Sequence, residues 1–378
     1  MKNKIKAAVI SAGMIANIGH LPAYQSFQDL VSVEAICDPD PVKAASTAQR
    51  FSIPHVFTDG QEMLAAIHPE MVSICSPNAS HKELTRQALE GGANVICEKP
   101  LAFNYSDAKE LFCLASQKNL LLTACQTGRF NRAFFAAKEY IDDGRLGTIY
   151  FAEINRIRRR GIPGWGAFHK KEASGGGAMA DIGVHALDSL LWMMGSPQVT
   201  AVSGCSSAHI VKNERNVIYN PEECGAIPGV NPVSKLNYDE FNVEEFSSGS
   251  IRTEKEIHII FKIAWAANLP NSSSFSIAGD KMGITLPELH LYSTLGKNQL
   301  DSVPRLFGFG EFDDRRFAGH HYLIQNFIHT LLGREELIVK PEETLNVTAA
   351  IDLFYRSCEI GREVNFIELL PSNNVNNQ

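Results

Sequence analysis

The sequence predicts a protein of two domains, in which a parallel α/β domain precedes an α+β domain built on a mostly antiparallel sheet. Three observations support this fold class. The chain has 378 residues, which is long for a single hydrophobic core. Its first third alternates short apolar runs with helical patterns, as βαβ units do. Beyond residue 199, strand patterns follow one another without intervening helices, which is typical of an antiparallel or mixed sheet.

The composition is that of an ordinary globular protein and excludes several classes of function. A net charge of −7 argues against a nucleic-acid partner, which would require a basic surface. No stretch approaches the roughly 20 apolar residues of a membrane-spanning helix, and the first apolar run is too short for a signal peptide. The eight cysteines have no C-x-x-C pairing. We therefore expect buried thiols in a cytoplasmic protein, with neither disulfides nor a metal site.

The elements of the first domain follow from continuous apolar runs, which are typical of strands buried on both faces. Asp40 and Pro41 are suited to the cap and first position of one helix, and Pro22 is expected to disturb another. The predicted strands are 6–10, 31–37, 71–75, 93–97 and 120–125, and the predicted helices are 14 onward, 41–51, 61–67, 81–90 and 106–118. We place this domain at residues 1–125.

The second domain is predicted at residues 126–371, before a disordered tail at 372–378. Its expected elements are a helix at 133–142, a strand at 149–158, strands between 199 and 284 (notably 256–265), and helices at 321–332 and 342–362. The basic run at 156–160 is interpreted as a solvated face, as most charge runs are.

The first strand leads into Ser11-Ala12-Gly13-Met14-Ile15-Ala16, close to the G-x-G-x-x-G/A fingerprint of a dinucleotide-binding turn. Ser11 replaces the first glycine, while Gly13 leaves room for a pyrophosphate at the start of a helix. The second strand ends at Asp38, which can accept hydrogen bonds from a ribose diol and would repel a 2′-phosphate. The sequence therefore predicts an N-terminal Rossmann sheet that binds NAD in preference to NADP.

Two further strands end in polar residues at the same edge of the parallel sheet, where ligands of open α/β folds bind. One ends in Ser76-Pro77-Asn78 followed by His81, and the next in Glu98-Lys99-Pro100. A partly desolvated Lys99 at this edge can serve as a proton donor. The alternative is a surface lysine paired with Glu98.

The glycine run 175–177 precedes a helix on which Asp181, His185 and Asp188 share one face. An imidazole beside a carboxylate is suited to proton transfer. The alternative is a polar stripe facing solvent, and we interpret Asp188 as structural.

Together, these three features resemble the Gfo/Idh/MocA family of oxidoreductases, which includes inositol dehydrogenases and glucose–fructose oxidoreductase. The resemblance covers nearly the whole chain, including the 126–130 transition and the stretch 243–246. It implies an open sheet in the second domain, with a face that makes the contacts between subunits of a homodimer or homotetramer.

The resemblance also assigns the site residues. The catalytic set is Lys99, Asp181 and His185, with His185 as general base and Lys99 stabilising the developing alkoxide. The expected NAD-binding residues are Ser11, Gly13, Met14, Ile15, Asp38, Ser76, Pro77, Asn78, His81, Glu98, Lys99 and Gln126. The expected substrate-binding residues are Lys99, Asn155, Arg158, Trp165, His169, Asp181 and His185.

The predicted reaction is NAD-dependent oxidation of a secondary alcohol of a sugar, glycoside or cyclitol. Trp165 is suited to stacking on a sugar ring, and the alternative is that it anchors its own loop. Two other functions remain open: a redox-neutral glycosidase that uses NAD transiently, and a non-catalytic sugar or NAD sensor. A sensor has no need of all three catalytic residues.

Overall fold

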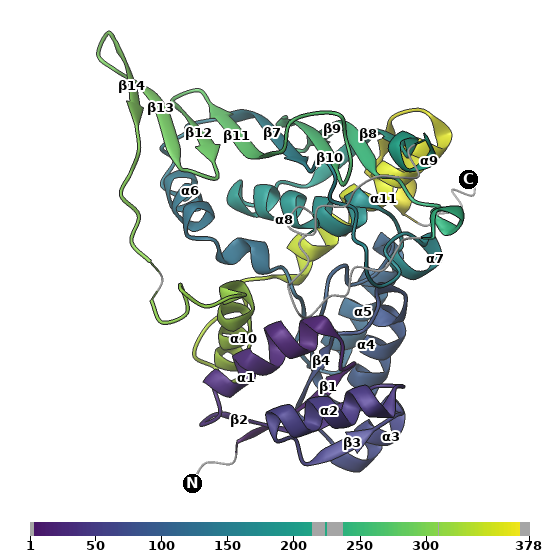
Figure 1. The fold of residues 1–378 in the computed structure, drawn as a ribbon. Helices are drawn as coiled ribbons and strands as arrows, with labels where there is room; N and C mark the ends of the chain where they lie inside the picture. The colour runs from purple at the N-terminus through teal and green to yellow at the C-terminus, as the bar shows by residue number, and fades with distance from the viewer. Residues whose placement is uncertain (1–3, 214–223, 225–236, 309, 371–378) are drawn as a thin grey trace, which may run out of the picture. The chain divides into compact units, whose positions relative to one another are not determined.

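The computed structural model describes residues 4–213, 224, 237–308 and 310–370, and the chain divides into two compact units (Figure 1). Unit 1 comprises Met1–Phe103, Asp107–Arg132 and Phe307–Thr344, and unit 2 comprises Asn104–Ser106, Ala133–Leu306 and Leu345–Gln378. The predicted tail at 372–378 lies outside the described residues. No helix in the described part of the chain is both long and apolar enough to cross a membrane.

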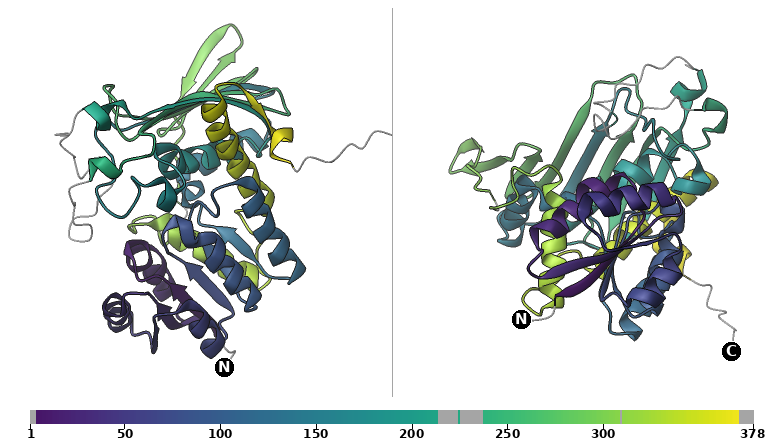
Figure 2. Two further views of the ribbon diagram at one scale, coloured as in Figure 1. Left: turned by 90° about the vertical axis from the view of Figure 1, so that its right-hand side faces the viewer. Right: turned by 60° about the horizontal axis from the view of Figure 1, so that its bottom comes forward.

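Unit 1 is built on a six-stranded parallel sheet with the order β3-β2-β1-β4-β5-β6, so the predicted parallel α/β fold is confirmed. The central strands of this sheet are buried because helices pack on both faces (Figure 2). The strands are β1 Ile5–Ile10, β2 Val31–Cys37, β3 His55–Phe57, β4 Met71–Ile74, β5 Asn94–Cys97 and β6 Leu122–Ala124. The helices are η1 Ala16–His20, α1 Leu21–Ser26, α2 Pro41–Phe51, α3 Gly60–Ile67, η2 Asn78–Ser80, α4 His81–Glu90, α5 Tyr105–Gln117, η3 Thr127–Phe130 and α10 Ala318–Leu331.

Local chemistry explains most of these element boundaries. Asp40 caps α2 by accepting hydrogen bonds from the N–H groups of Val42 and Lys43, as predicted. The disturbance expected at Pro22 takes the form of the π-helix η1, which immediately precedes α1. The sequence prediction missed β3, a three-residue edge strand whose side chains are mostly exposed, so it lacks the apolar run of a central strand.

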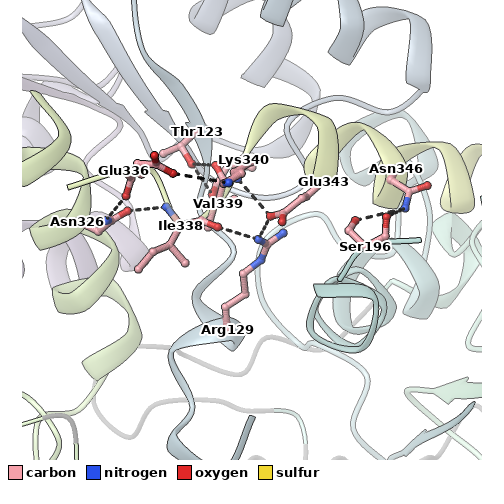
Figure 3. A network of polar contacts seen from close by, with 11 residues as sticks. Thr123, Arg129, Ser196, Asn326, Glu336, Ile338, Val339, Lys340, Glu343 and Asn346 are labelled. Carbon is pink, nitrogen blue, oxygen red and sulfur yellow. Dashed lines mark hydrogen bonds and ion pairs between the residues drawn. The ribbon is translucent and has the colours of Figure 1, made fainter. Parts of the chain in front are cut away.

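The segment 307–344, which the sequence prediction assigned to the second domain, packs within unit 1. Helix α10 buries Leu323, Ile324, Phe327 and Ile328 and contacts α1, η1 and η3. The following loop is held by polar contacts (Figure 3). The fully buried Arg129 donates to the Ile338 carbonyl at 3.0 Å and pairs with Glu343, and the Thr123 hydroxyl donates to the Val339 carbonyl at 3.2 Å. Local sequence patterns cannot show that a segment following unit 2 in sequence packs back in unit 1.

Unit 2 is built on a nine-stranded sheet with the order β14-β13-β12-β11-β7-β10-β9-β8-β15. Only β7 and β10 pair in parallel, which confirms the predicted mostly antiparallel sheet. The strands are β7 Ile149–Ile157, β8 Val199–Ser207, β9 Phe246–Thr253, β10 His258–Ala264, β11 Ser272–Gly279, β12 Met282–Leu286, β13 His290–Leu295, β14 Asn298–Ser302 and β15 Val364–Asn365.

Helices α6, α8 and α11 all lie on one face of this sheet (Figures 1 and 2). The helices of unit 2 are α6 Arg132–Asp142, α7 Lys171–Ser174, η4 Met179–Gly183, α8 Val184–Met193, α9 His209–Asn213, η5 Tyr238–Glu240, α11 Pro341–Ile360 and η6 Phe366–Leu369. Nine residues of α8 are buried, so this helix passes through the centre of the unit 2 core. Its N-terminal end carries His185, and η4 just before it carries Asp181.

Candidate functional site

The turn after β1 keeps the shape of a dinucleotide-binding turn despite Ser11. Ser11 has φ 78°, a left-handed conformation that glycine adopts without cost and other residues at roughly 1–2 kcal/mol. The Ser11 hydroxyl donates to Asp38 Oδ2 at 3.3 Å, and this hydrogen bond offsets part of that cost. The departure from the fingerprint therefore leaves the turn intact.

Asp38 is held directly against this turn. Its Oδ2 accepts the Ala12 N–H at 2.8 Å, and its Oδ1 accepts the Asp40 N–H at 2.9 Å. The residue is only 8 % exposed. A carboxylate oxygen has two lone pairs, so Asp38 keeps acceptor capacity for a ribose diol while these contacts fix its position.

Gly13 has no packing reason within the protein to be glycine. A Cβ at this position would come no closer than 3.5 Å to any neighbouring atom, and the backbone φ is not positive. The Asn17 amide donates to the carbonyls of Ala12 and Gly13 at 2.9 and 3.0 Å, which holds these carbonyls in the turn. The first N–H groups of a helix have no intrahelical acceptor, so this turn fits a pyrophosphate. The sequence prediction did not identify Asn17.

His81 connects two of the predicted cofactor loops. Its Nδ1 lies 2.7 Å from the Pro100 carbonyl, and its Nε2 lies 2.8 Å from the Ser76 carbonyl. Because both partners can only accept, both ring nitrogens must carry hydrogen. Burial lowers the pKa of His81, but Cys97 and the two carbonyls outweigh burial and raise the pKa to about 9. The ring nitrogens are thus used within the protein, and a contact of His81 with the cofactor stays a prediction.

Lys99 lies two residues beyond the end of β5 and is half-buried. Its backbone N–H donates to Glu98 Oε2 at 3.3 Å, while Glu98 Oε1 lies 3.0 Å from His20 Nε2 and 3.2 Å from His320 Nε2. The alternative of a surface pair between Glu98 and Lys99 is therefore wrong, because the Glu98 carboxylate is buried with two histidines.

Gln126 follows β6 and is 2 % exposed. Its side-chain Oε1 is buried and has no hydrogen-bond partner among the described residues. An orphaned buried acceptor is costly, so it indicates a missing donor. Together with the turn at Gly13 and the carboxylate of Asp38, this orphaned acceptor fits a bound dinucleotide.

In unit 2, the glycine run makes room for Glu244 and Tyr355. A Cβ on Gly177 would lie 1.8 Å from the Glu244 carbonyl oxygen, and one on Gly176 would lie 1.9 Å from the Tyr355 hydroxyl. Packing within unit 2 therefore requires glycine at positions 176 and 177, because protein atoms occupy the space beside both.

The carboxylate of Glu244 caps the start of the helix that carries Asp181. It accepts the N–H groups of Gly177 and Met179 at 2.9 Å each, and the Tyr355 hydroxyl at 3.0 Å. Burial raises the pKa of Glu244, against the opposing effect of these donors. A carboxylate at a helix N-terminus satisfies N–H groups that lack intrahelical partners. The resemblance covered Glu244, but the sequence carried no signal for this role.

Asp181 and His185 lie on consecutive helical segments, η4 and α8, and both are half-buried. The fully buried Trp265 donates its indole N–H to Asp181 Oδ2 at 3.0 Å, which fixes the carboxylate. Asp188 is only 1 % exposed, so the alternative of a polar stripe facing solvent is wrong for this residue and its structural interpretation is supported.

The basic run 156–160 is not a solvated face, since only Arg159 is exposed. Arg156 donates to the Ser273 hydroxyl, and Arg158 donates to the carbonyls of Gly161 and Cys224 at 3.2 and 3.3 Å. Burial and the charge of Arg158 lower the pKa of Arg156, and the charge of Asp181 opposes them. The structure thus places Arg156, which the sequence prediction passed over, in the electrostatic environment of Asp181.

The other predicted substrate residues differ in their surroundings. Asn155 is adjacent to Arg156 on β7, and because side chains alternate along a strand, the two side chains lie on opposite faces. Asn155 Oδ1 is buried and has no hydrogen-bond partner among the described residues. His169 is 8 % exposed, and its Nδ1 has no hydrogen-bond partner within the described residues. Trp165 is half-buried in the loop before α7.

Comparisons with known proteins match both parts of this arrangement. Residues 5–125 match the family model described as "Oxidoreductase family, NAD-binding Rossmann fold", and residues 134–285 match the "GFO/IDH/MocA C-terminal domain". These two ranges cover well over half of the chain.

Among curated proteins, D-glucoside 3-dehydrogenase of Escherichia coli K12 is 31% identical over 362 residues, covering 95% of this chain and 97% of that protein. Levoglucosan dehydrogenase of Pseudarthrobacter phenanthrenivorans is 28% identical over 185 residues, covering 47% of this chain and 46% of that protein. A solved structure of levoglucosan dehydrogenase in complex with NADH and L-sorbose has a TM-score of 0.80 at 19% identity, covering 96% of this chain and 99% of the other. This last likeness shows the fold alone.

Proposed function

Because the chain belongs to the Gfo/Idh/MocA family of NAD-binding oxidoreductases, we propose that it oxidises a secondary alcohol of a sugar or glycoside, or reduces the corresponding keto-sugar. The observation that carries this proposal is the similarity to D-glucoside 3-dehydrogenase, which extends over 95% of the chain and therefore over both units. A cyclitol substrate has less support, since the relatives of this chain that are named for a substrate include a glucoside, a levoglucosan and an apiose dehydrogenase.

Lys99, Asp181 and His185 form the proposed catalytic set. His185 takes the proton of the substrate hydroxyl, since an imidazole titrates near neutral pH. Asp181, fixed by Trp265, orients His185 or shares the proton. The Lys99 ammonium donates a hydrogen bond to the developing alkoxide. NAD, when bound, supplies the acceptor for the hydride.

The features that we assign to NAD binding are in unit 1. We propose that the turn at residues 11–15 binds the pyrophosphate, that Asp38 binds the ribose diol, and that Gln126 finds its missing donor on the cofactor. Ser76, Pro77, Asn78 and Lys99 follow the strand ends at the same edge of the sheet. The position of Asp38 against the turn favours NAD over NADP, because a 2′-phosphate there would meet a fixed negative charge.

The features that we assign to sugar binding are in unit 2. Arg156 and Arg158 are half-buried cations that can bind adjacent hydroxyls, and the buried Nδ1 of His169 has no hydrogen-bond partner among the residues that the structure describes. Trp165 remains the proposed stacking surface for a sugar ring. Asn155 stays a proposed substrate residue: it projects from the opposite face of β7 to Arg156, and its buried Oδ1 has no partner among the described residues.

The test is incubation of the purified protein with NAD and a panel of glucosides, free sugars and cyclitols, with NADH followed by absorbance. The proposal predicts net NADH formation with at least one glucoside and slower or no reaction with cyclitols. Glycosidic cleavage without net NADH formation would instead show a redox-neutral hydrolase. Binding of sugar and NAD without either reaction would show a sensor.

We also propose that the chain forms a homo-oligomer through the face of the unit 2 sheet opposite to α6, α8 and α11. Large apolar side chains of this sheet are exposed, among them Tyr150, Ile260 and Tyr292. Light scattering coupled to size exclusion tests this proposal. A Tyr150→Lys, Ile260→Lys double variant should shift the mass to that of the monomer, and a wild-type monomer would contradict it.

A further inference from the structure

Four side chains that commonly bind metal ions meet inside unit 1. They are His20 at the end of η1, Glu98 after β5, Cys125 after β6 and His320 in α10. One potential ligand atom from each residue lies within 4.8 Å of all the others, and all four residues are buried. Because no two of these ligands are close in sequence, cysteine and histidine spacing could not predict this cluster.

We propose that His20, Glu98, Cys125 and His320 bind one Zn²⁺ ion. Two imidazole nitrogens, one thiolate and one carboxylate are all ligands that zinc uses in proteins, whereas magnesium and calcium prefer oxygen alone. Four protein ligands with no open position are typical of a structural site. This proposal is independent of the proposed reaction, in which these four side chains have no chemical step.

The distances between the ligand atoms fit tetrahedral coordination. With zinc–nitrogen and zinc–oxygen bonds of about 2.0–2.1 Å and a zinc–sulfur bond of about 2.3 Å, ligand atoms lie about 3.3 Å apart, or about 3.6 Å where one is sulfur. Glu98 Oε1 lies 3.0 Å from His20 Nε2 and 3.2 Å from His320 Nε2. Cys125 Sγ lies 3.8 Å from His20 Nε2. These three distances lie within about 0.3 Å of the tetrahedral values, and all the ligand atoms lie within 4.8 Å of one another.

The ligands are oriented by neighbours outside the cluster, as metal ligands usually are. His20 Nδ1 lies 3.0 Å from Ser73 Oγ, which lies 2.7 Å from the Tyr24 hydroxyl. These contacts direct Nε2 of His20 toward the other ligands. The His320 ring approaches closely because residue 19 is glycine: a Cβ there would lie 2.8 Å from His320 Cδ2. Gly19 is therefore required by the position of this ring.

The charges also suit a divalent cation. Beside its two imidazoles, the cluster holds one carboxyl group, of Glu98, and one thiol, of Cys125. When zinc binds, its bond to Cys125 replaces the S–H bond, and one proton leaves for solvent. The carboxylate and thiolate then balance the two charges of the ion, and the buried cluster becomes neutral.

Cobalt binding to the whole protein, first stripped with a chelator, tests the proposal without any substitution. Tetrahedral Co²⁺ with a thiolate ligand should give intense visible d–d bands and a near-ultraviolet sulfur-to-cobalt band. Zinc added afterwards should displace the cobalt and abolish both kinds of band at about one equivalent per chain. Zinc binding should release about one proton. Saturating zinc should also raise the melting temperature by about 5–15 °C.

Matched variants locate the site. Cys125→Ser should remove the sulfur-to-cobalt band, and His320→Gln should weaken zinc binding at least 100-fold. Cys37→Ser is the control, because Cys37 is likewise a buried cysteine at the end of a parallel strand of this sheet but lies outside the cluster. The proposal is overturned if the wild-type protein binds less than about 0.1 zinc per chain from micromolar zinc, or if Cys125→Ser keeps the sulfur-to-cobalt band.

Discussion

The stability of unit 1 should decrease in mildly alkaline solution, because His81 holds two loops together only when it is protonated. Its ring donates to the carbonyls of Ser76 and Pro100, and its pKa is raised from 6.5 to about 9. When the pKa of a group is higher in the folded than in the unfolded protein, the group stabilises the fold fully at a pH below its pKa in the unfolded state. This stabilisation is lost as the pH rises through the pKa of the group in the folded state. The stabilisation is therefore complete below about pH 6.5 and absent above about pH 9.5.

The two pKa values set the size of this effect. Linkage gives about 2–3 kcal/mol of lost unfolding free energy between about pH 7 and pH 9.5. His81→Gln removes the titrating group and leaves one amide oxygen facing a carbonyl. It should therefore lower stability at pH 7 by a similar amount and flatten this part of the pH profile.

Urea unfolding followed by circular dichroism measures this effect across the pH range. The three tryptophans, Trp165, Trp192 and Trp265, all lie in unit 2, so their fluorescence reports that unit separately. His55→Gln is the control, because His55 is an exposed residue of β3 in the same unit. The reasoning is refuted if the wild type and His81→Gln show parallel pH profiles.

Three further predictions concern the cofactor, the glycine run and the substrate. Asp38→Ala should narrow the preference for NAD over NADP at least tenfold, measured as the ratio of kcat/KM values, and an unaltered ratio would remove Asp38 from the ribose site. Gly177→Ala should destabilise unit 2 by more than about 3 kcal/mol in tryptophan-monitored unfolding, because its Cβ would overlap the Glu244 carbonyl. Gly283→Ala is the control: its Cβ would meet nothing closer than 3.5 Å, so it should cost less than about 1 kcal/mol. Trp165→Ala should raise the KM for the sugar more than the Kd for NAD, whereas equal losses would indicate that Trp165 only anchors its loop.

The sequence was most informative where local chemistry decides the structure. The buried parallel strands, the Asp40 cap and the fingerprint turn all follow from residue types at short spacing, and all are observed. Ser11 shows the limit of such a pattern. A non-glycine residue broke the fingerprint, yet its hydroxyl bonds to Asp38 and helps to keep the same turn.

The features that the sequence did not reveal depend on residues distant in the chain. Glu244 lies 67 residues beyond Gly177, and only the folded structure shows that its carboxylate caps the helix of Asp181. Helix α10 follows the strands of unit 2 in sequence but packs in unit 1, where it brings His320 to His20 and Glu98. The buried state of Arg156 likewise depends on its partner Ser273, on a neighbouring strand.

The most direct test of the proposed function is the rate of NADH formation from a glucoside by the wild type and by Lys99→Ala, with the Kd for NAD measured in parallel. We expect substrate-dependent NADH formation by the wild type and a loss of kcat of about 10²–10⁴ in the variant. The Kd for NAD should change far less than kcat, because Lys99 is one of many proposed NAD contacts and the turn at Gly13 and Asp38 is unchanged. The proposal is contradicted if the wild type binds NAD but none of the tested sugars leads to NADH formation. It is also contradicted if Lys99→Ala forms NADH at the wild-type rate.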